Sequence, residues 1–403
     1  MHFPWCLAKC PYCDFVSYAT PRDAIDHAGY ADAVLRELEA RAPALGARAE
    51  EVTIGSVFFG GGTPSLWEPA ELGRVLARIR AILPCAAESS DADGLEVTVE
   101  CNPTSLDGAR AAALRDVGVN RLSIGTQALR KEQLEFLGRL HDPNGAIASV
   151  RGALASGMPR VSTDMIFGLP GQSPDDARAQ AEELADLGLS HLSCYQLTIE
   201  SGTRFGELAK RGRLPLADDG LVAEAFLAID EALAARGLAH YEISNYARPG
   251  EEARHNLGYW RGDEYLGLGC GAYGFVRNRT RARESGDARA VRYRNAIDPR
   301  KYVEGTRAIR PGVPAEGDGL TLTCEPLDGE TMLRERIMLG LRLARGLDFE
   351  EAARDLGVEA WTLERRRAAD RLEQQGRLTR TAERTFIPRG GWIWADDTSA
   401  RLF

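Results

Sequence analysis

The sequence predicts an α/β fold whose parallel strands form a doubly wound sheet or a full or partial (β/α) barrel. From residue 50 to about residue 200, short apolar and β-branched runs alternate with alanine- and leucine-rich stretches of helical pattern. Strands in this order are parallel and are joined by right-handed helical crossovers. Polar residues recur where the predicted strands end, and both architectures place functional loops at that edge.

Five strands and five helices are expected in this part of the chain. The strands are SVFFG (56–60), LEVTVEC (95–101), RLSIG (121–125), VSTDMIFG (161–168) and HLSCYQL (191–197). The helices cover residues 69–82, 106–117, 130–138, 144–156 and 174–187. Ser105 and Ser173 are interpreted as helix start signals, and Pro174 directly after Ser173 strengthens the second.

The alternation stops after residue 200. A helix over 219–236 is followed by HYEISNYARPG and HNLGYWRGDEYLGLGCGAYGF, which are typical of loops and short strands. Residues 277–310 hold eleven Lys or Arg against four acids, which indicates a solvated loop or a contact surface for an anionic group.

Near the C-terminus, three helices are expected at 331–344, 348–356 and 361–376, and a hairpin in RTFIPRGGWIWA, as in a winged helix. We therefore expect three parts: a barrel over 1–200, a connecting region over 201–325 and a C-terminal helical domain over 326–403.

Composition limits the class of protein. Of 403 residues, 44% are hydrophobic, which is enough for a large core and more than one domain. The net charge of −9 argues against a surface that binds nucleic acid throughout. The sequence shows no basic and apolar leader and no apolar run of about 18 residues, and its eight cysteines are spread widely. A reduced, cytoplasmic location is therefore expected.

Three of the cysteines, Cys6, Cys10 and Cys13, lie within eight residues, and clustered thiols in a reduced compartment indicate metal or redox chemistry. Structural zinc usually takes four ligands, and neither His2 nor His27 has the usual spacing for the fourth. A thioredoxin-like pair would leave Cys6 unexplained. The remaining interpretation is an iron–sulfur cluster with three protein thiolates, which leaves one iron open to a non-protein ligand. The other cysteines are interpreted as buried hydrophobic residues: Cys85, Cys101, Cys194, Cys270 and Cys324.

The C-x3-C-x2-C loop resembles that of the radical S-adenosylmethionine superfamily. In that superfamily the loop follows the first barrel strand and holds a 4Fe-4S cluster, and S-adenosylmethionine chelates the open iron. Nearly the whole chain resembles one group within it, the HemN/HemW group of oxygen-independent coproporphyrinogen III dehydrogenases and related haem chaperones. The resemblance implies a partial (β/α)6 barrel and rests on these motifs: MHFPWCLAKCPYCDF, FFGGGTPSLW, VTVECNP, NRLSIGTQ, LGRLHD, DMIFGLPGQ and HNLGYWRGDEYLGLGCGAY.

The resemblance also implies roles for the glycine-rich turn and the cysteine loop. Gly61, Gly62 and Thr63 would lie against the methionine part of the nucleotide, where a missing side chain lets the backbone approach the ligand. Tyr12, between two cluster ligands, would offer backbone atoms to the adenine.

Four polar residues would bind the rest of the nucleotide. Glu100 would accept from the ligand amino group, and Arg139 would pair with its carboxylate. Gln127 and Asp164 would bind the ribose hydroxyls. Each residue type suits its task, because acceptors face donors and a fork-shaped guanidinium faces a carboxylate.

Two features separate the branches of this group. The dehydrogenase pattern has another cysteine two residues after the third ligand, where this chain has Phe15. The chaperone branch has phenylalanine there and a His-Asn-x-x-Tyr-Trp motif, matched by His255, Asn256, Tyr259 and Trp260. Members also carry a tyrosine six residues before the first ligand. This sequence begins too late to include it, so we expect most of the first barrel strand and one nucleotide contact to be absent.

The motif histidine has two interpretations. Imidazole is a common axial haem ligand, neighbouring aromatic residues can stack on a porphyrin, and arginines in 277–310 can meet its propionates. Alternatively, His255 caps a turn in a packed aromatic loop. The sequence leaves both open.

Three functions are compared. The first is a haem carrier that delivers haem to an acceptor protein and keeps the cluster and S-adenosylmethionine as structural or regulatory cofactors. The second is oxidative decarboxylation of coproporphyrinogen III. The third is a nucleic-acid module, suggested by ERRRAADR (364–371), although a solvated helix face explains this segment better. We expect the first function and no nucleic-acid partner. A transient contact with a membrane surface is left open.

Overall fold

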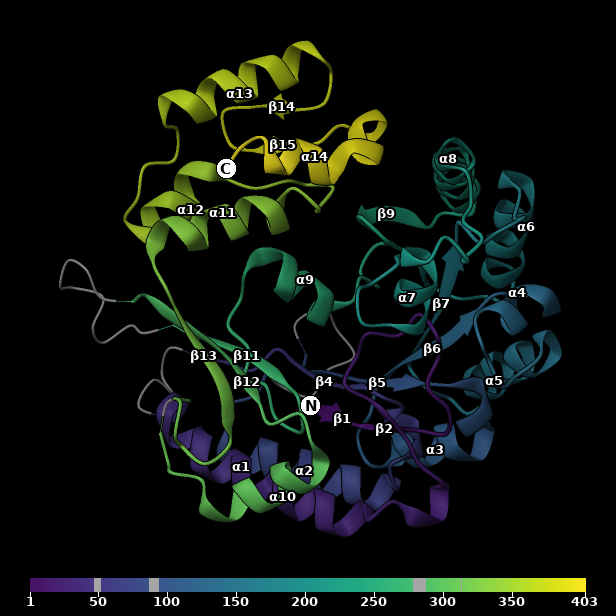
Figure 1. Ribbon diagram of the computed structural model, residues 1–403, viewed down its shortest axis with the longest axis vertical. Helices are drawn as coiled ribbons and strands as arrows, with labels where there is room; N and C mark the ends of the chain where they lie inside the picture. Colours follow the sequence, from purple (N-terminus) through teal and green to yellow (C-terminus); the bar gives the residue numbers. More distant parts are fainter. Residues whose placement is uncertain (47–51, 87–93, 278–287, 313) are drawn as a thin grey trace.

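The centre of the molecule is one curved sheet, which Figure 1 shows wrapped by helices. The computed structural model describes residues 1–46, 52–86, 94–277, 288–312 and 314–403. The eight strands lie in the order β1-β4-β5-β6-β7-β8-β10-β9. The first six are parallel, and β10 is antiparallel to both β8 and β9. The predicted α/β fold with a six-stranded parallel barrel is confirmed. The strands are β1 (His2–Phe3), β4 (Ser56–Gly61), β5 (Glu96–Cys101), β6 (Arg121–Gln127), β7 (Arg160–Phe167), β8 (His191–Gln196), β9 (Ala239–Glu242) and β10 (Asn245–Ala247).

Helices connect the strands on the outside of the sheet. Leu72, Val75, Leu76 and Ile79 of α2 are buried, which is the spacing of one helix face. Ser173 caps α6 as expected, but α3 is capped by Asp107 and not by Ser105. These helices are α1 (His27–Gly46), α2 (Pro69–Ile82), α3 (Gly108–Asp116), α4 (Lys131–Phe136), α5 (Pro143–Ala155), α6 (Pro174–Ala185), α7 (Arg204–Lys210) and α8 (Asp219–Ala235).

A second, three-stranded antiparallel sheet lies beside the barrel, in the order β11-β12-β13. It comprises β11 (Tyr273–Arg277), β12 (Ala290–Asn295) and β13 (Thr321–Leu327), with α10 (Pro299–Ala308) between the last two strands. The interpretation of 277–310 as a loop is therefore wrong for β12 and α10, and residues 278–287 lie outside the described residues.

The segments expected to be loop and short strand do contain β9, β10 and the start of β11, but HNLGYWR lies in helix α9 (Arg254–Arg261), so the prediction was wrong for that part. The first turn of α9 is stabilised by a carboxylate from the barrel, because Glu96 accepts from the backbone N–H groups of Arg254 and His255 at 3.2 and 3.1 Å. Gly262, with φ of 70°, ends the helix in the left-handed conformation. The helix could not be predicted from local sequence, because the carboxylate that caps it comes from β5, far away in the chain.

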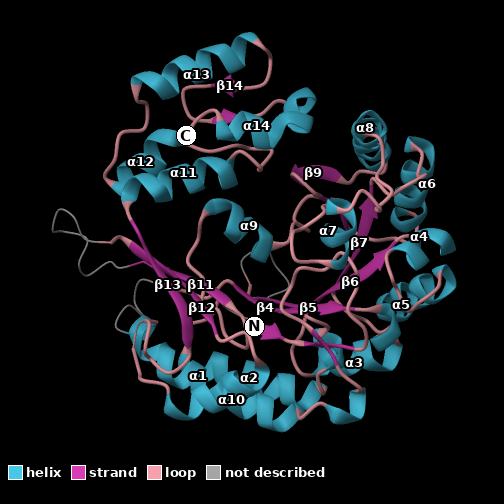
Figure 2. Cartoon of the chain, in the orientation of Figure 1, coloured by secondary structure: helices cyan, strands magenta, loops and turns pink. Residues whose placement is uncertain are grey.

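The C-terminal part is mostly helical (Figure 2), and its buried residues form a hydrophobic core together with Ala290 and Leu327 of the second sheet. The predicted hairpin lies earlier than expected, because RTFIPRGGWIWA contributes one short strand and then a 3-10 helix. The elements are α11 (Gly329–Gly340), α12 (Phe349–Leu356), α13 (Leu363–Gln374), β14 (Thr379–Arg380), β15 (Thr385–Phe386), η4 (Arg389–Trp394) and α14 (Ala395–Ala400). Within the described ranges, no helix is long and apolar enough to cross a membrane.

Glu37 on α1 is a fully buried carboxylate that joins the barrel to the second sheet. Its Oε1 accepts from Arg41 Nε at 3.0 Å and from Asn295 of β12 at 2.6 Å. Its Oε2 accepts from the N–H of Gly269 at 2.8 Å and from the hydroxyl of Tyr302 on α10 at 2.7 Å. All four lone-pair sites are thus used, as a buried charge requires.

Replacing Glu37 with Ala should lower the free energy of unfolding by about 3–5 kcal/mol, because buried Arg41 would lose its shorter ion pair and keep only the one to Asp318 at 3.4 Å. Chemical denaturation measures this change. Glu39→Ala is the matched control, because Glu39 lies on the same helix, is exposed, and pairs with exposed Arg78. That change should cost less than about 1 kcal/mol. Equal effects of the two substitutions would contradict the structural role of Glu37.

Candidate functional site

The first six residues lie against the glycine-rich turn that ends β4. Both β1 and β2 (Trp5–Cys6) belong to this segment. Three backbone hydrogen bonds fix it, from Gly60 N–H to Met1 O (2.9 Å), Gly62 N–H to Phe3 O (2.7 Å) and Thr63 N–H to Trp5 O (2.8 Å). Because Cys6 ends this segment, the turn fixes where the cysteine loop begins.

The turn needs its glycines for contacts within the chain itself. A Cβ on Gly62 would lie 2.6 Å from the carbonyl oxygen of Trp5. A Cβ on Gly61 would lie 2.7 Å from the ring of His2, and Gly61 also has φ of 110°. The expected reason for these glycines was the approach of a ligand. The structure adds the close packing of the N-terminal segment.

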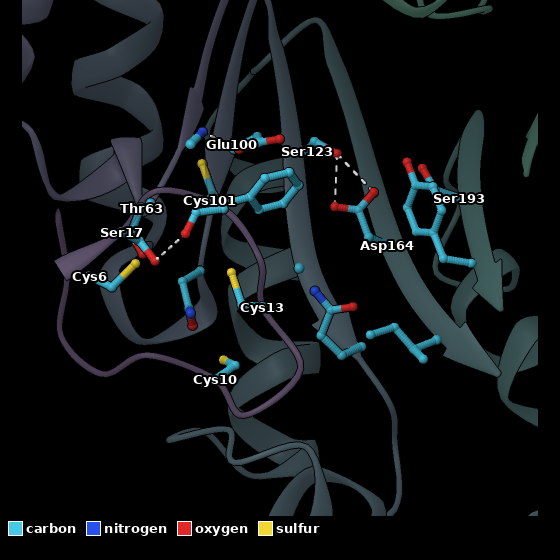
Figure 3. A pocket seen from close by; sticks show the side chains of 18 of the residues that line it. Cys6, Cys10, Cys13, Ser17, Thr63, Glu100, Cys101, Ser123, Asp164 and Ser193 are labelled. Atoms are coloured by element: carbon cyan, nitrogen blue, oxygen red, sulfur yellow. Dashed lines mark hydrogen bonds between the residues drawn. The ribbon is translucent and has the colours of Figure 1, made fainter. Parts of the chain in front are cut away.

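The three thiols lie on one loop at the carboxyl ends of the strands (Figure 3). Cys13 N–H donates to Cys10 O at 3.2 Å, and Arg139 Nη1 donates to Cys10 Sγ at 3.3 Å. Burial raises the pKa of the Cys6 and Cys13 thiols. In the described part of the chain, no three His, Cys, Asp or Glu side chains converge closely enough to hold a single metal ion.

The structure brings every predicted site residue to one cavity of about 560 Å³. These residues are Cys6, Cys10, Tyr12, Cys13, Gly61, Gly62, Thr63, Glu100, Gln127, Arg139, Asp164 and His255. They come from segments as distant as the N-terminal loop and α9, so the strand ends do converge as expected. The ring of Tyr12 lies 6.4 Å from that of Phe205 on α7.

Two carboxyl groups face the thiols across the cavity (Figure 3). Glu100 Oε2 accepts from Gly61 N–H at 3.0 Å, and burial together with the nearby Asp164 raises the Glu100 pKa to about 7. Ser123 Oγ lies 3.0 and 3.1 Å from the two oxygens of Asp164, whose pKa is raised by burial. A cationic ligand group in this cavity would favour the ionised form of both carboxyl groups.

Gln127 has a strained backbone. Its φ of 64° is the sole positive value at a non-glycine position in the described residues, and the register of β6 shifts between Ile124 and Gln127. Such strain costs about 1–3 kcal/mol and clusters at functional sites. Gly125 makes room for it, since a Cβ there would lie 2.7 Å from Gln127 Nε2. Arg139 Nη2 donates to Gly125 O at 3.0 Å, whereas the buried Arg139 Nε has no partner in the described structure.

The sequence interpretation missed the polar inner face of the barrel. Alternate residues of four neighbouring strands line the cavity below the carboxyl groups: Glu96, Thr98, Arg121, Ser123, Ser162, His191 and Ser193. The alternation that predicts this face is present in EVTVE, RLS, STD and HLS, where polar residues occupy every second position. Cys101 also lines the cavity. It is buried as expected, as are Cys194 and Cys270, but Cys85 and Cys324 are only half-buried, so that prediction was wrong for these two.

His255 lies where α9 meets the barrel. Its ring stacks on Phe58 with 4.4 Å between centroids and 9° between planes, and it meets Tyr259 edge-on at 4.8 Å. The Ser56 hydroxyl lies 3.2 Å from Nδ1, while Nε2 has no hydrogen-bond partner among the described residues. Burial lowers the His255 pKa to about 3, so the imidazole is neutral near pH 7.

Two further cavities meet at the same histidine. One, of about 690 Å³, lies between α9 and the amino-terminal end of β4. The other, of about 540 Å³, is lined by aromatic residues that include Phe15, Phe58, Tyr259 and Tyr273. Its one arginine, Arg294, lies 4.7 Å from the Tyr273 ring centroid. In the described part of the chain Arg294 forms no ion pair, and its buried Nε has no partner.

Comparison with known families matches both ends of the chain. Residues 1–184 match the radical SAM superfamily, and residues 327–394 match the HemN C-terminal domain. The structure also resembles that of coproporphyrinogen III oxidase (HemN) from Escherichia coli, with a TM-score of 0.76 and 19% sequence identity over 100% of this chain and 88% of that one. At this identity, the likeness shows the fold.

Two curated relatives match most of the sequence. Heme chaperone HemW of Escherichia coli K12 is 37% identical over 306 residues, covering 76% of this chain and 75% of the relative. Heme chaperone HemW of Mycobacterium tuberculosis H37Rv is 34% identical over 348 residues, covering 86% and 82%. These identities and coverages show that the chain belongs to the HemN/HemW group of the radical S-adenosylmethionine superfamily.

Proposed function

We propose that this protein is a cytoplasmic haem chaperone that binds haem and passes it to an acceptor protein. The observation that carries the proposal is the position of His255. Its neutral imidazole lies where the cavity of the three thiols meets the aromatic cavity that contains Arg294. The names of the HemW relatives support the same function.

The thiol end of the cavity fits a 4Fe-4S cluster with S-adenosylmethionine at its open iron. Cys6, Cys10 and Cys13 would supply three thiolates. Cys101 also lines this cavity, but its thiol donates to Val99 O at 3.5 Å and burial raises its pKa, which keeps it protonated. The unpartnered Nε of Arg139 is a buried donor suited to the ligand carboxylate, and the Glu100 carboxyl suits its amino group. When bound, the cluster would supply an open iron that the nucleotide chelates and an electron for the nucleotide's sulfonium.

Beside the thiols, Asp164 and Gln127 remain the proposed acceptors for the ribose hydroxyls. Ser123 orients the Asp164 carboxyl from below through its two contacts. The turn of Gly61, Gly62 and Thr63 would face the methionine part, and the backbone near Tyr12 would face the adenine.

The aromatic cavity fits a porphyrin. Flat rings stack on aromatic faces, and Phe15 is 58% exposed at the border between this cavity and that of the thiols. The free donors of Arg294 suit a propionate. The Ser56 hydroxyl at Nδ1 would fix the ring of His255 and leave Nε2 for the iron, as partners of ligating histidines commonly do.

The described contacts of residues 364–371 do not favour a nucleic-acid module. Arg365 of that segment is buried, donates to the carbonyls of Ala360 and Leu402 at 2.8 and 2.9 Å, and pairs with Glu330 at 2.9 Å. This arginine therefore serves the packing of the helical part.

Replacing His255 with Ala should reduce haem affinity at least about tenfold, because an axial ligand is lost. The cluster should remain, since its thiolates are untouched. Haemin titration followed by absorbance measures the first effect, and iron and sulfide content measures the second. His27→Ala is the control, because His27 lies outside the three cavities described above. Unchanged haemin binding would remove His255 as ligand, and anaerobic conversion of coproporphyrinogen III would contradict a carrier without enzyme activity.

Replacing Arg294 with Met should weaken haemin binding about three- to tenfold while leaving the affinity for haemin dimethyl ester unchanged, because one charge-assisted hydrogen bond to a propionate is lost. Competitive titration of the two porphyrins measures the ratio. Arg300→Met, an exposed arginine on α10, should leave both affinities unchanged. An equal loss for the acid and the ester would contradict the propionate contact.

A further inference from the structure

The base of the thiol cavity holds buried polar groups for which the proposed cofactor contacts give no role. Thr98 on β5, Arg121 on β6 and His191 on β8 line this cavity, and each is 2% exposed. Thr98 is the direct neighbour of Arg121 across the two parallel strands. Arg121 also contributes to the lowered pKa of His191, after burial, which places the two side chains within electrostatic reach.

Each of these side chains has one polar atom without a partner in the described structure: Thr98 Oγ1, Arg121 Nη1 and His191 Nδ1. Buried polar atoms are nearly always hydrogen-bonded, so three in one cavity require an explanation. The rest of the Arg121 guanidinium is satisfied. Nε donates to Glu96 at 2.9 Å, and Nη2 donates to the carbonyls of Glu251 and Glu252 at 3.0 and 3.3 Å.

The hydrogen bond of the other ring nitrogen bears on the tautomer of His191. Its Nε2 lies 2.8 Å from the hydroxyl of Tyr241, and that hydroxyl accepts from Ala253 N–H at 3.2 Å. We assign the tyrosine hydrogen to Nε2, and this assignment puts the imidazole hydrogen on Nδ1. Both nitrogens at the base of the cavity donate, and the Thr98 hydroxyl can donate as well.

These donors select an oxygen acceptor, and the guanidinium favours an anionic one. The nearby Glu96 leaves Arg121 Nη1 without a partner among the described residues, since its three hydrogen bonds come from Arg121 Nε and from the N–H groups of Arg254 and His255. We propose that the base of the cavity is a binding subsite for one carboxylate group. This group belongs either to a small free carboxylate or to an arm of the porphyrin, and the second source rests on the proposed haem function.

The first experiment uses the haem-free protein and sodium propionate as the probe. Thermal unfolding is followed with increasing propionate, against sodium chloride at equal concentration. The midpoint should rise in a saturable way for the wild type. Thr98→Val removes one donor without changing side-chain shape and should weaken the apparent affinity about three- to tenfold.

A matched control for Thr98 exists two strands away in the same sheet. Thr163 on β7 is equally buried and its Oγ1 is also without a partner, but it does not line this cavity. Thr163→Val should keep the wild-type response. His191→Leu, a second variant that removes the Nδ1 donor, should repeat the effect of Thr98→Val. Arg121 is left intact, because its loss would strand the Glu96 carboxylate.

The second experiment compares haemin with haemin dimethyl ester. The preference is the ratio of the affinity for haemin to the affinity for its dimethyl ester. A smaller ratio in Thr98→Val than in the wild type assigns the subsite to a porphyrin arm. An unchanged preference, with propionate binding still weakened, assigns it to a separate small carboxylate. If propionate has no saturable effect, or if Thr98→Val and Thr163→Val respond alike, the groups are served by water alone and the proposal is overturned. Neither result depends on whether the protein delivers haem.

Discussion

The close approach of the first six residues to the turn after β4 fixes the place of the three thiols. Two glycines allow it, because a Cβ at either position would overlap the N-terminal segment. Backbone hydrogen bonds of 2.7 to 2.9 Å then hold the segment along the turn, and the cysteine loop leaves from its end. The thiols consequently face the carboxyl ends of the strands, where the barrel places its polar side chains.

A second constraint ties the histidine motif to the same cavity. Glu96 lies inside the barrel, pairs with Arg121 at 2.9 Å and caps the first turn of α9. Both side chains of the pair are almost fully buried, so water does not compete for the hydrogen bond between them. The helix that carries His255 is therefore held by the barrel interior. The base of the cavity is therefore connected to His255 by direct contacts, from Arg121 to Glu96 and from Glu96 to the first turn of α9.

Much of this arrangement could be predicted from the sequence, because local patterns carry it. All five expected barrel strands appear near their predicted bounds, and the repeated polar strand ends converge in one cavity. What could not be predicted depends on distant partners. HNLGYW became a helix because a carboxylate 159 residues away caps it. The strain at Gln127 arises from an irregularity in strand pairing, and the unpartnered donors of Arg121 and His191 depend on which neighbours fold against them.

The central claim is that three thiolates hold a cubane cluster whose fourth iron takes a nucleotide in the cavity shared with His255. Iron, sulfide and zinc content of protein reconstituted without oxygen tests it directly, together with the EPR spectrum of the reduced cluster. We expect about four irons and four sulfides per chain, and a changed EPR spectrum when S-adenosylmethionine is added. Stoichiometric zinc without inorganic sulfide would contradict it.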